Sequence, residues 1–200
     1  CFVAWKKARE ASDFPGYAPI LQDMFALKRE VAATTRPDVC AAGEPYDGAL
    51  DACVEQLAGA WRERPGGLVL VHGAGCFGHW QAKEAQVHEG WQGADRLGFA
   101  RTRAAVTRLN SLVVSRLVAA GVPAVGLPAF PSWTTSGPGQ LAGSSSAPVG
   151  AAASALGAGL LPVLHGDAVL DDNQGCSILS GDLLVRELAL GLGACHAVFL

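Results

Sequence analysis

The sequence has little charge, no extreme charge balance and no long apolar run, and each shortage excludes a class of protein. Only 16% of the 200 residues are charged, and the formal net charge is −3. A nucleic-acid partner would call for a basic surface, so we do not expect one. The most apolar stretch, residues 150–164, is shorter than the ~20 residues that a membrane span requires. Charged residues at positions 6, 7, 9 and 10 interrupt any apolar leader. We therefore expect a soluble, cytoplasmic protein with no membrane partner.

Paired cysteines are also lacking. The six cysteines are scattered, with no CxxC pair and no histidine at zinc-finger spacing. Isolated cysteines of this kind are typical of a reducing compartment, where they act as small buried apolar residues. The sequence therefore predicts no structural metal site.

Charge and periodicity divide the chain into two parts. Residues 1–60 carry six Lys and Arg against nine Asp and Glu, whereas the remainder is balanced. Helical patterns occupy residues 1–33 and 49–62, separated by a turn-rich loop. Beyond residue 62, strands and helices alternate, which predicts an α/β fold with a parallel sheet covered by helices on both faces. Predicted strands lie at 68–72, 122–127, 160–165 and 197–200, and predicted helices at 103–120, 149–156 and 180–192, with a loop over 128–148.

The strongest local signal is a glycine-rich run, His72-Gly73-Ala74-Gly75-Cys76-Phe77-Gly78-His79, directly after a predicted strand. Glycine permits a positive φ, and backbone N–H groups in such a turn can point at phosphate oxygens. A plain tight turn is the alternative. His79 could donate a hydrogen bond to a phosphate, although a lone histidine can equally be structural.

A second signal combines His165-Gly166-Asp167 with Ser180-Gly181-Asp182. Ligands of open α/β sheets collect at the carboxyl ends of strands, and Gly181 stands at a predicted helix N-terminus. Simple helix capping is the alternative there. Asp167 and Asp182 are candidates for holding a lysine or magnesium near a transferring phosphoryl group, while Asp171 and Asp172 read as turn residues. Two facing anion sites indicate phosphoryl transfer.

These motifs together resemble isopentenyl phosphate kinase of the amino acid kinase superfamily over residues 62–200. The matching runs are LVLVHGAGCFGHWQAKE, TRAAVTRLNSLVV, GVPAVGL, GLLPVLHGDAVLD and GCSILSGDLLVRELA. The resemblance implies a three-layer α/β/α sandwich, which is incomplete in this chain. It also implies conversion of isopentenyl phosphate and ATP, with Mg2+, into isopentenyl diphosphate for isoprenoid synthesis, and a possible homodimer.

The resemblance also implies roles for individual residues. The helix over 103–120 would line the pocket for the isoprenoid tail, His79 would hold the substrate phosphate, and Asp182 would organise a catalytic lysine. The implied residues are Ala74, Gly78, His79 and Gly181 for substrate binding, Gly73, Gly75 and Asp167 for the nucleotide, and His79 and Asp182 for catalysis.

Two features of the family have no counterpart in the sequence. No Lys-x-Gly-Gly-Ser-type loop precedes residue 62, and residues 197–200 match the strand before the family's nucleotide-binding half. We therefore expect impaired activity in this chain. The alternatives are an inactive remnant or ligand-binding module, and another amino acid kinase that acts on an acylated amino acid or a nucleotide.

The first 50 or so residues resemble an N-terminal helical piece of the carboxypeptidase Taq metallopeptidases. The matching segments are Trp5-Lys6-Lys7-Ala8-Arg9, Leu27-Lys28-Arg29-Glu30 and Pro45-Tyr46-Asp47-Gly48. Those enzymes need an HExxH zinc helix, which this sequence lacks, so peptidase activity is not expected. The sequence predicts a helical segment over 1–55, joined to a partial kinase domain over 56–200.

Overall fold

The computed structural model describes residues 47–137 and 139–198. The predicted helices within residues 1–33 and the loop up to residue 46 lie outside the described residues. The boundary at residue 55 stays a prediction, and helix α4 (Asp47–Glu63) runs across that position. α4 confirms the helix expected over 49–62.

A three-stranded parallel sheet forms the centre of the fold. Its order is β1 (Leu70–His72), β4 (Leu161–His165) and β2 (Ala124–Gly126). All five residues of β4 are buried, as expected for a central strand with helices on both of its faces. The register pairs Leu70 with Val163 and His72 with His165, so β1 and β4 end side by side. The predicted parallel α/β sheet is confirmed.

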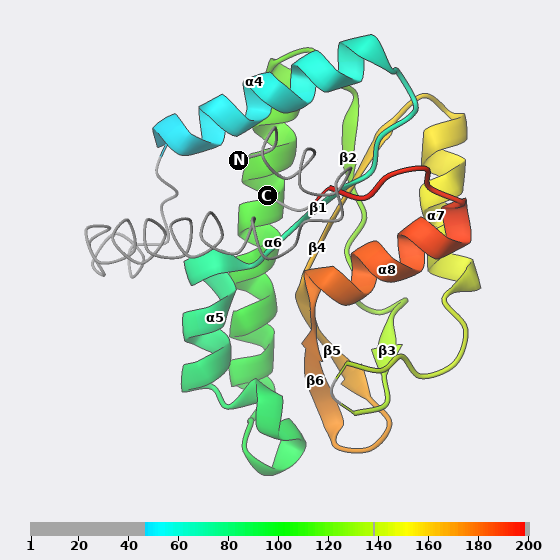
Figure 1. Ribbon diagram of the computed structural model, residues 1–200. Coiled ribbons are helices and arrows are strands. Elements are labelled where there is room, and N and C mark those ends of the chain that lie inside the picture. The colour runs from blue at the N-terminus through cyan, green and yellow to red at the C-terminus, as the bar shows by residue number, and fades with distance from the viewer. Residues whose placement is uncertain (1–46, 138, 199–200) are drawn as a thin grey trace, which may run out of the picture. The chain divides into compact units, whose positions relative to one another are not determined.

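Helices cover both faces of this sheet, which gives the three predicted layers (Figure 1). Successive residues of a strand point to opposite faces, so Val163 packs with α4 and with α6 (Arg96–Ala119), while Leu164 packs against the opposite layer. That layer consists of α7 (Ser146–Gly157) and α8 (Gly181–Leu192). Leu117 of α6 and Leu184 of α8 are fully buried against the two faces.

A second, smaller sheet was not predicted. β5 (Asp167–Asp171) and β6 (Gly175–Leu179) form an antiparallel hairpin, and β3 (Thr134–Thr135) pairs with β5 inside the predicted loop over 128–148. Asp171 organises the hairpin turn, as its turn assignment anticipated: its carboxylate accepts hydrogen bonds from the backbone N–H groups of Asn173, Gln174 and Gly137. Burial raises the pKa of Asp171, but these hydrogen bonds outweigh it and the pKa lies below its ordinary value.

Several element boundaries differ from the sequence predictions. α6 begins at Arg96 rather than residue 103, because the Asp95 carboxylate accepts the Gly98 N–H and caps the helix there. The carboxylate supplies an acceptor for a backbone N–H of the first turn, which has no acceptor within the helix. The strand expected over 197–200 is not seen in its two described residues, which pair with no described strand. An apolar run forms a strand only where a neighbour supplies its hydrogen bonds.

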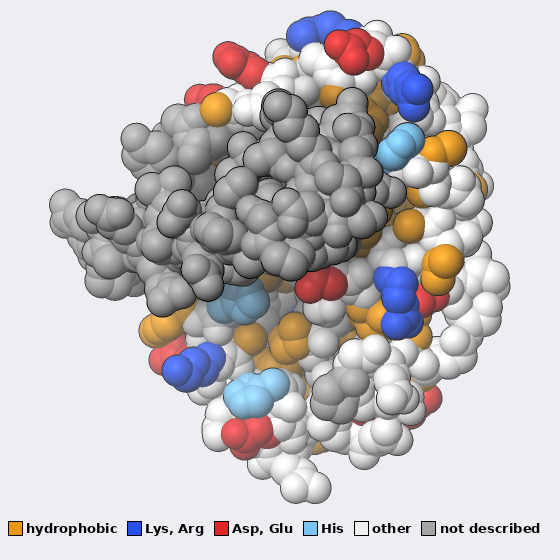
Figure 2. Space-filling view, in the orientation of Figure 1, with side chains coloured by type: hydrophobic (Ala, Val, Ile, Leu, Met, Phe, Trp, Pro, Cys, Tyr) orange, Lys and Arg blue, Asp and Glu red, His pale blue; other side chains and the backbone are white. Residues whose placement is uncertain are grey.

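α5 (Gly75–Glu84) and the 3-10 segment η1 (Val87–Gln92) lie between β1 and α6. Within the described part of the chain, no helix combines the length and apolarity needed to cross a bilayer. On the face shown in Figure 2, the described basic and acidic side chains are interspersed and form no large patch of one sign.

The contact between α4 and the rest of the unit can be tested with two tryptophans. Trp61 of α4 is 6% exposed and belongs to the cluster beneath α6, whereas Trp80 of α5 is 57% exposed. Trp61→Ala should lower the free energy of unfolding by about 3–5 kcal/mol, because it opens a cavity in the core. The matched control Trp80→Ala should change it by less than about 0.5 kcal/mol. Urea unfolding of both variants measures this, and equal small effects would show that α4 does not pack as described.

Candidate functional site

Two histidines end the neighbouring parallel strands β1 and β4. Their rings stack with centroids 5.4 Å apart and planes inclined by 24°. His72 Nδ1 lies 2.9 Å from the Gly73 carbonyl oxygen, and His165 Nδ1 lies 2.9 Å from that of Gly166. A carbonyl oxygen can only accept, so Nδ1 carries the hydrogen in both rings. Each histidine thereby holds the first residue of the turn that follows its strand.

Asn110 of α6 fixes the state of His72. Its side-chain Nδ2 lies 3.0 Å from His72 Nε2 and donates to it, which requires a neutral imidazole. Burial lowers the pKa of His72; the neighbouring His165 lowers it further, and the Gly73 hydrogen bond acts in the opposite direction. Gly126 of β2 makes room for this amide, because a Cβ there would lie 2.6 Å from Asn110 Oδ1. The end of β1 is therefore tied to α6 by an uncharged hydrogen bond.

The two predicted phosphate motifs meet at this edge of the sheet. The Gly166 N–H donates to the His72 carbonyl oxygen over 3.3 Å. A Cβ placed on Gly166 would lie 3.3 Å from the Gly181 nitrogen, and one on Gly181 would lie 3.8 Å from the His72 carbonyl oxygen. Segments about a hundred residues apart thus meet at one edge of the sheet, where the backbone of positions 72, 166 and 181 lies close together. We call this edge, at the carboxyl ends of β1 and β4, the crevice, because ligands of open α/β sheets bind there.

The glycine-rich run is mostly helical. Gly73 and Ala74 alone link β1 to α5, and the predicted loop over 73–79 therefore continues as the first turns of that helix. The first hydrogen bond back along this turn joins the Gly78 N–H to the Ala74 carbonyl oxygen, 3.1 Å away. The N–H groups of the first three helical residues have no intrahelical acceptor, and Ala74 offers no side-chain cap. Such a helix end favours an anion.

α8 presents a second helix N-terminus to the crevice. The Ser180 hydroxyl accepts the Leu183 N–H over 3.2 Å, so the capping role weighed for Ser180 is present. This cap satisfies only one of the free N–H groups of the first turn, and that of Gly181 remains available. Asp182 is exposed in the same turn. Two positive helix ends therefore face the same edge of the sheet.

The glycines of the first motif differ in their surroundings. A Cβ on Gly73 or Gly75 would meet nothing within 4 Å, and Gly75 has φ +49°. A Cβ on Gly78 would lie 2.6 Å from Val106 Cγ1 of α6, so Gly78 permits the close packing of α5 on α6. His79 is exposed on α5, one residue further on. The nucleotide and substrate roles assigned to these residues stay predictions.

Asp167 is buried beside the crevice. Its side chain is 0% exposed, and its Oδ2 accepts two hydrogen bonds from Arg103, from Nε at 3.2 Å and from Nη2 at 3.1 Å. Its Oδ1 accepts the Ala168 N–H at 2.8 Å. Burial raises the pKa of Asp167 above its ordinary value, and the Arg103 hydrogen bonds and charge oppose that rise. Protein donors therefore already bind both carboxylate oxygens. The predicted contact of Asp167 with a nucleotide stays a prediction.

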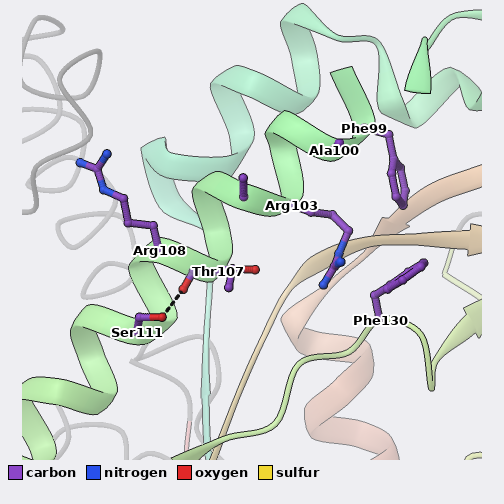
Figure 3. A pocket seen from close by; sticks show the side chains of 8 residues that line it. Phe99, Ala100, Arg103, Thr107, Arg108, Ser111 and Phe130 are labelled. Carbon is purple, nitrogen blue, oxygen red and sulfur yellow. Dashed lines mark hydrogen bonds between the residues drawn. The ribbon is translucent and has the colours of Figure 1, made fainter. Parts of the chain in front are cut away.

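An open surface cavity of about 630 Å³ lies along α6, and Arg103 forms part of its wall. The Arg103 guanidinium crosses from α6 to the ring of Phe130, with its Cζ 4.3 Å from the ring centroid (Figure 3). The residues that line the cavity are Phe99, Ala100, Arg103, Ala104, Thr107, Arg108, Ser111 and Phe130. Small side chains at positions 100 and 104 leave the space open on the helix side.

Sequence reasoning missed Arg103, Asn110 and Phe130 as members of this region. For Asn110 a signal existed: it falls between Val106 and Val113 on the inner stripe of α6, where an amide must find a buried partner. Arg103 and Phe130 gave no such signal, because their contacts come from segments far away in the sequence.

The fold places the chain among α/β proteins whose parallel sheet is covered by helices on both faces. The chain belongs to the amino acid kinase family, whose model, "Amino acid kinase family", matches residues 35–200.

Within that family, the chain is homologous to isopentenyl phosphate kinases. It is 44% identical to the isopentenyl phosphate kinase of Arabidopsis thaliana over 136 residues, which are 66% of this chain and 40% of the relative. It is 36% identical to that of Methanothermobacter thermautotrophicus, over 64% of this chain and 49% of the relative. The chain thus spans less than half the length of these relatives.

Solved structures agree with this assignment. An isopentenyl phosphate kinase crystal structure superimposes with a TM-score of 0.66 at 31% identity and covers 76% of this chain and 61% of its own. A product complex of the T. acidophilum isopentenyl phosphate kinase has a TM-score of 0.60 at 22% identity, over 73% of this chain and 57% of its own, which supports the fold. A carboxypeptidase Taq (M32) metallopeptidase model matches residues 1–58, which confirms the second resemblance.

Two glycine-to-alanine variants test which glycine of the first motif is tightly packed and which faces open space. Gly78→Ala should lower the free energy of unfolding by about 1–3 kcal/mol, because the new methyl group overlaps Val106 and Ala74. Gly73→Ala adds a methyl group to open space and should change it by less than about 0.5 kcal/mol. Chemical denaturation measures both. A fully stable Gly78→Ala protein would mean that α5 and α6 lie further apart than described.

His72 should make stability depend on pH. Because its folded-state pKa lies below the ordinary 6.5, the unfolded state binds more protons between these two values. The stability that neutral His72 contributes is fully present above pH 6.5. It is lost as the pH falls towards the lowered pKa of His72 in the folded state. Unfolding free energies from about pH 8 to about pH 5.5 should fall more steeply for the unsubstituted protein than for His72→Gln. Parallel curves would show that His72 is not buried in its neutral form.

Proposed function

We propose that this chain binds isopentenyl phosphate, and that in the intact enzyme ATP phosphorylates it to isopentenyl diphosphate. The observation that supports this most directly is the crevice, where the N-termini of α5 and α8 face the ends of β1 and β4. Two helix ends provide fixed backbone donors for two phosphate groups. The homology to isopentenyl phosphate kinases identifies the substrate class.

The substrate phosphate is proposed to sit at the start of α5. The free N–H groups of its first turn would bind phosphate oxygens, and Ala74 and Gly78 would shape that turn. His79 would donate a further hydrogen bond from the same helix. Gly181 would contribute an N–H from the opposite side of the crevice. These donors lose no freedom on binding, since the ends of β1 and β4 already fix them, and preorganised donors of this kind lower the barrier of phosphoryl transfer.

The isopentenyl tail is proposed to occupy the cavity along α6. The Phe99 and Phe130 rings and the methyl groups of Ala100 and Ala104 offer it apolar surface. Contact with this apolar surface would hold the tail beside the phosphate. The same cavity would discriminate against phosphorylated ligands that have no apolar tail.

The nucleotide side of the reaction is proposed to involve Gly73, Gly75 and Asp182. The open space around both glycines allows a phosphate to approach the backbone, and Asp182 could hold a cationic group beside the transferring phosphoryl. ATP, when bound, supplies that phosphoryl group. Across residues 47–137 and 139–198, no group of three acidic, histidine or cysteine side chains could hold a metal ion. Mg2+ would therefore be bound chiefly by the phosphates, as it is in many kinases, and Asp167 would act through the backbone it holds.

Binding of isopentenyl phosphate should depend on His79. Titration calorimetry of the unsubstituted chain should detect binding, and His79→Ala should weaken it about 10- to 100-fold, the usual effect of one hydrogen bond to a charged group. His88→Ala is the matched control, because His88 is exposed on η1 and contacts Glu89. Absence of binding by the unsubstituted protein, or equal affinity in His79→Ala, would contradict the proposed site.

Turnover is expected to be weak in the 200-residue chain, which spans less than half of its curated relatives. A coupled assay that follows ADP release with isopentenyl phosphate and ATP measures this. Rapid formation of isopentenyl diphosphate would show that these residues suffice for catalysis. Binding without turnover would favour a ligand-binding module.

A further inference from the structure

Helix α6 is joined to the crevice at two points, seven residues apart. Asn110 bonds to His72 at the end of β1, and Arg103 bonds to Asp167 directly after Gly166. Residues seven apart lie on the same face of a helix. The part of α6 between them contributes Ala104 and Thr107 to the cavity wall. The two polar contacts therefore fix how far the cavity lies from the phosphate crevice.

The Arg103–Asp167 contact is firmly held on the Asp167 side. The carboxylate is completely buried, and an unpaired buried charge is costly. Arg103 donates two hydrogen bonds to one oxygen, and the Ala168 N–H occupies the other. Gly166, the residue before Asp167, is held separately by the hydrogen bond from its N–H to the His72 carbonyl oxygen.

On its other side, Arg103 supports the aromatic wall of the cavity. Its guanidinium lies over the Phe130 ring, and that ring makes an edge contact with Phe99 at 6.1 Å between centroids. Phe99 in turn meets Trp91 at 5.3 Å. Trp91 is anchored to the β5–β6 turn, because its backbone N–H donates to the Gln174 carbonyl oxygen over 2.9 Å. Phe130 comes from the long segment after β2, and its ring is contacted on its face by the Arg103 guanidinium and at its edge by Phe99, so Arg103 helps to orient it.

We propose that Arg103 is a positioning residue that sets the selectivity of this site for the tail of the phosphorylated substrate. It holds Phe130 as a wall of the tail cavity while Asp167 holds Arg103 in register with the crevice. This inference rests on the proposed function and adds to it the group that couples tail recognition to the phosphate site. Arg103 itself need not touch the phosphate.

The test compares two ligands that share a phosphate and differ in the tail. Calorimetric Kd values for isopentenyl phosphate and methyl phosphate give a preference ratio for each protein. In Arg103→Met this ratio should fall about four- to fifteen-fold, the equivalent of one or two lost methylene contacts. The Kd for methyl phosphate should stay within about twofold, because the crevice donors are unchanged. Phe130→Ala should lower the ratio in the same way.

Two further variants guard against simple unfolding. Arg101→Met is the matched control, an exposed arginine on the same helix, and should keep the preference ratio of the unsubstituted protein. The double variant Arg103→Met/Asp167→Asn removes the unpaired buried charge, so it should melt at a higher temperature than Arg103→Met alone and still show the lowered ratio.

The outcomes separate this inference from the proposed function. If the unsubstituted protein binds isopentenyl phosphate but Arg103→Met keeps its preference ratio, or weakens both ligands equally, Arg103 is structural and the inference is overturned. If the unsubstituted protein binds neither ligand, the proposed function fails, and this inference fails with it.

Discussion

The pairing of β1 with β4 is the constraint on which the site depends. Parallel strands in register deliver their carboxyl ends to the same edge of a sheet, and here the pair His72 and His165 ends both strands at once. Everything placed after these residues, the start of α5, the Gly166 turn and the hairpin that leads to α8, is therefore forced into one neighbourhood. The buried β4 leaves little freedom to change that register, because a slip would disrupt the close packing of its side chains in both helical layers.

Neutral polar contacts complete this arrangement at the end of β1. His72 is held uncharged between Gly73 and Asn110, while the one buried carboxylate beside the crevice is paired with Arg103. The backbone N–H groups at the starts of α5 and α8 add partial positive charge that is fixed in space and cannot be titrated. A site of this kind favours an anion with defined geometry rather than negative charge in general.

The similarity to isopentenyl phosphate kinases gives this geometry a chemical context. Two different family models match the two parts of the chain. The amino acid kinase model begins at residue 35, and the carboxypeptidase Taq model ends at residue 58. Helix α4 lies across this overlap and packs through Val54 and Trp61 on the kinase-like unit. The apolar face of α4 therefore belongs physically with the kinase-like part, whichever ancestry its residues have.

Local patterns in the sequence predict the fold class and the edge of the sheet at which the two glycine motifs meet. Apolar β-branched runs, amphipathic periods and glycines at strand ends are local properties, so the parallel sheet, the helices α4, α6 and α8 and the meeting of the Gly73 and Gly181 segments could be predicted. Where the glycine run becomes helix, and where α6 begins, depended on single capping contacts that periodicity does not reveal. Folding alone brings Asp167 to Arg103, Asn110 to His72 and Phe130 to the cavity wall. The partners in these contacts lie up to 64 residues apart in the sequence. The free energy of burying a polar group depends on which hydrogen-bond partner the folded chain brings to it.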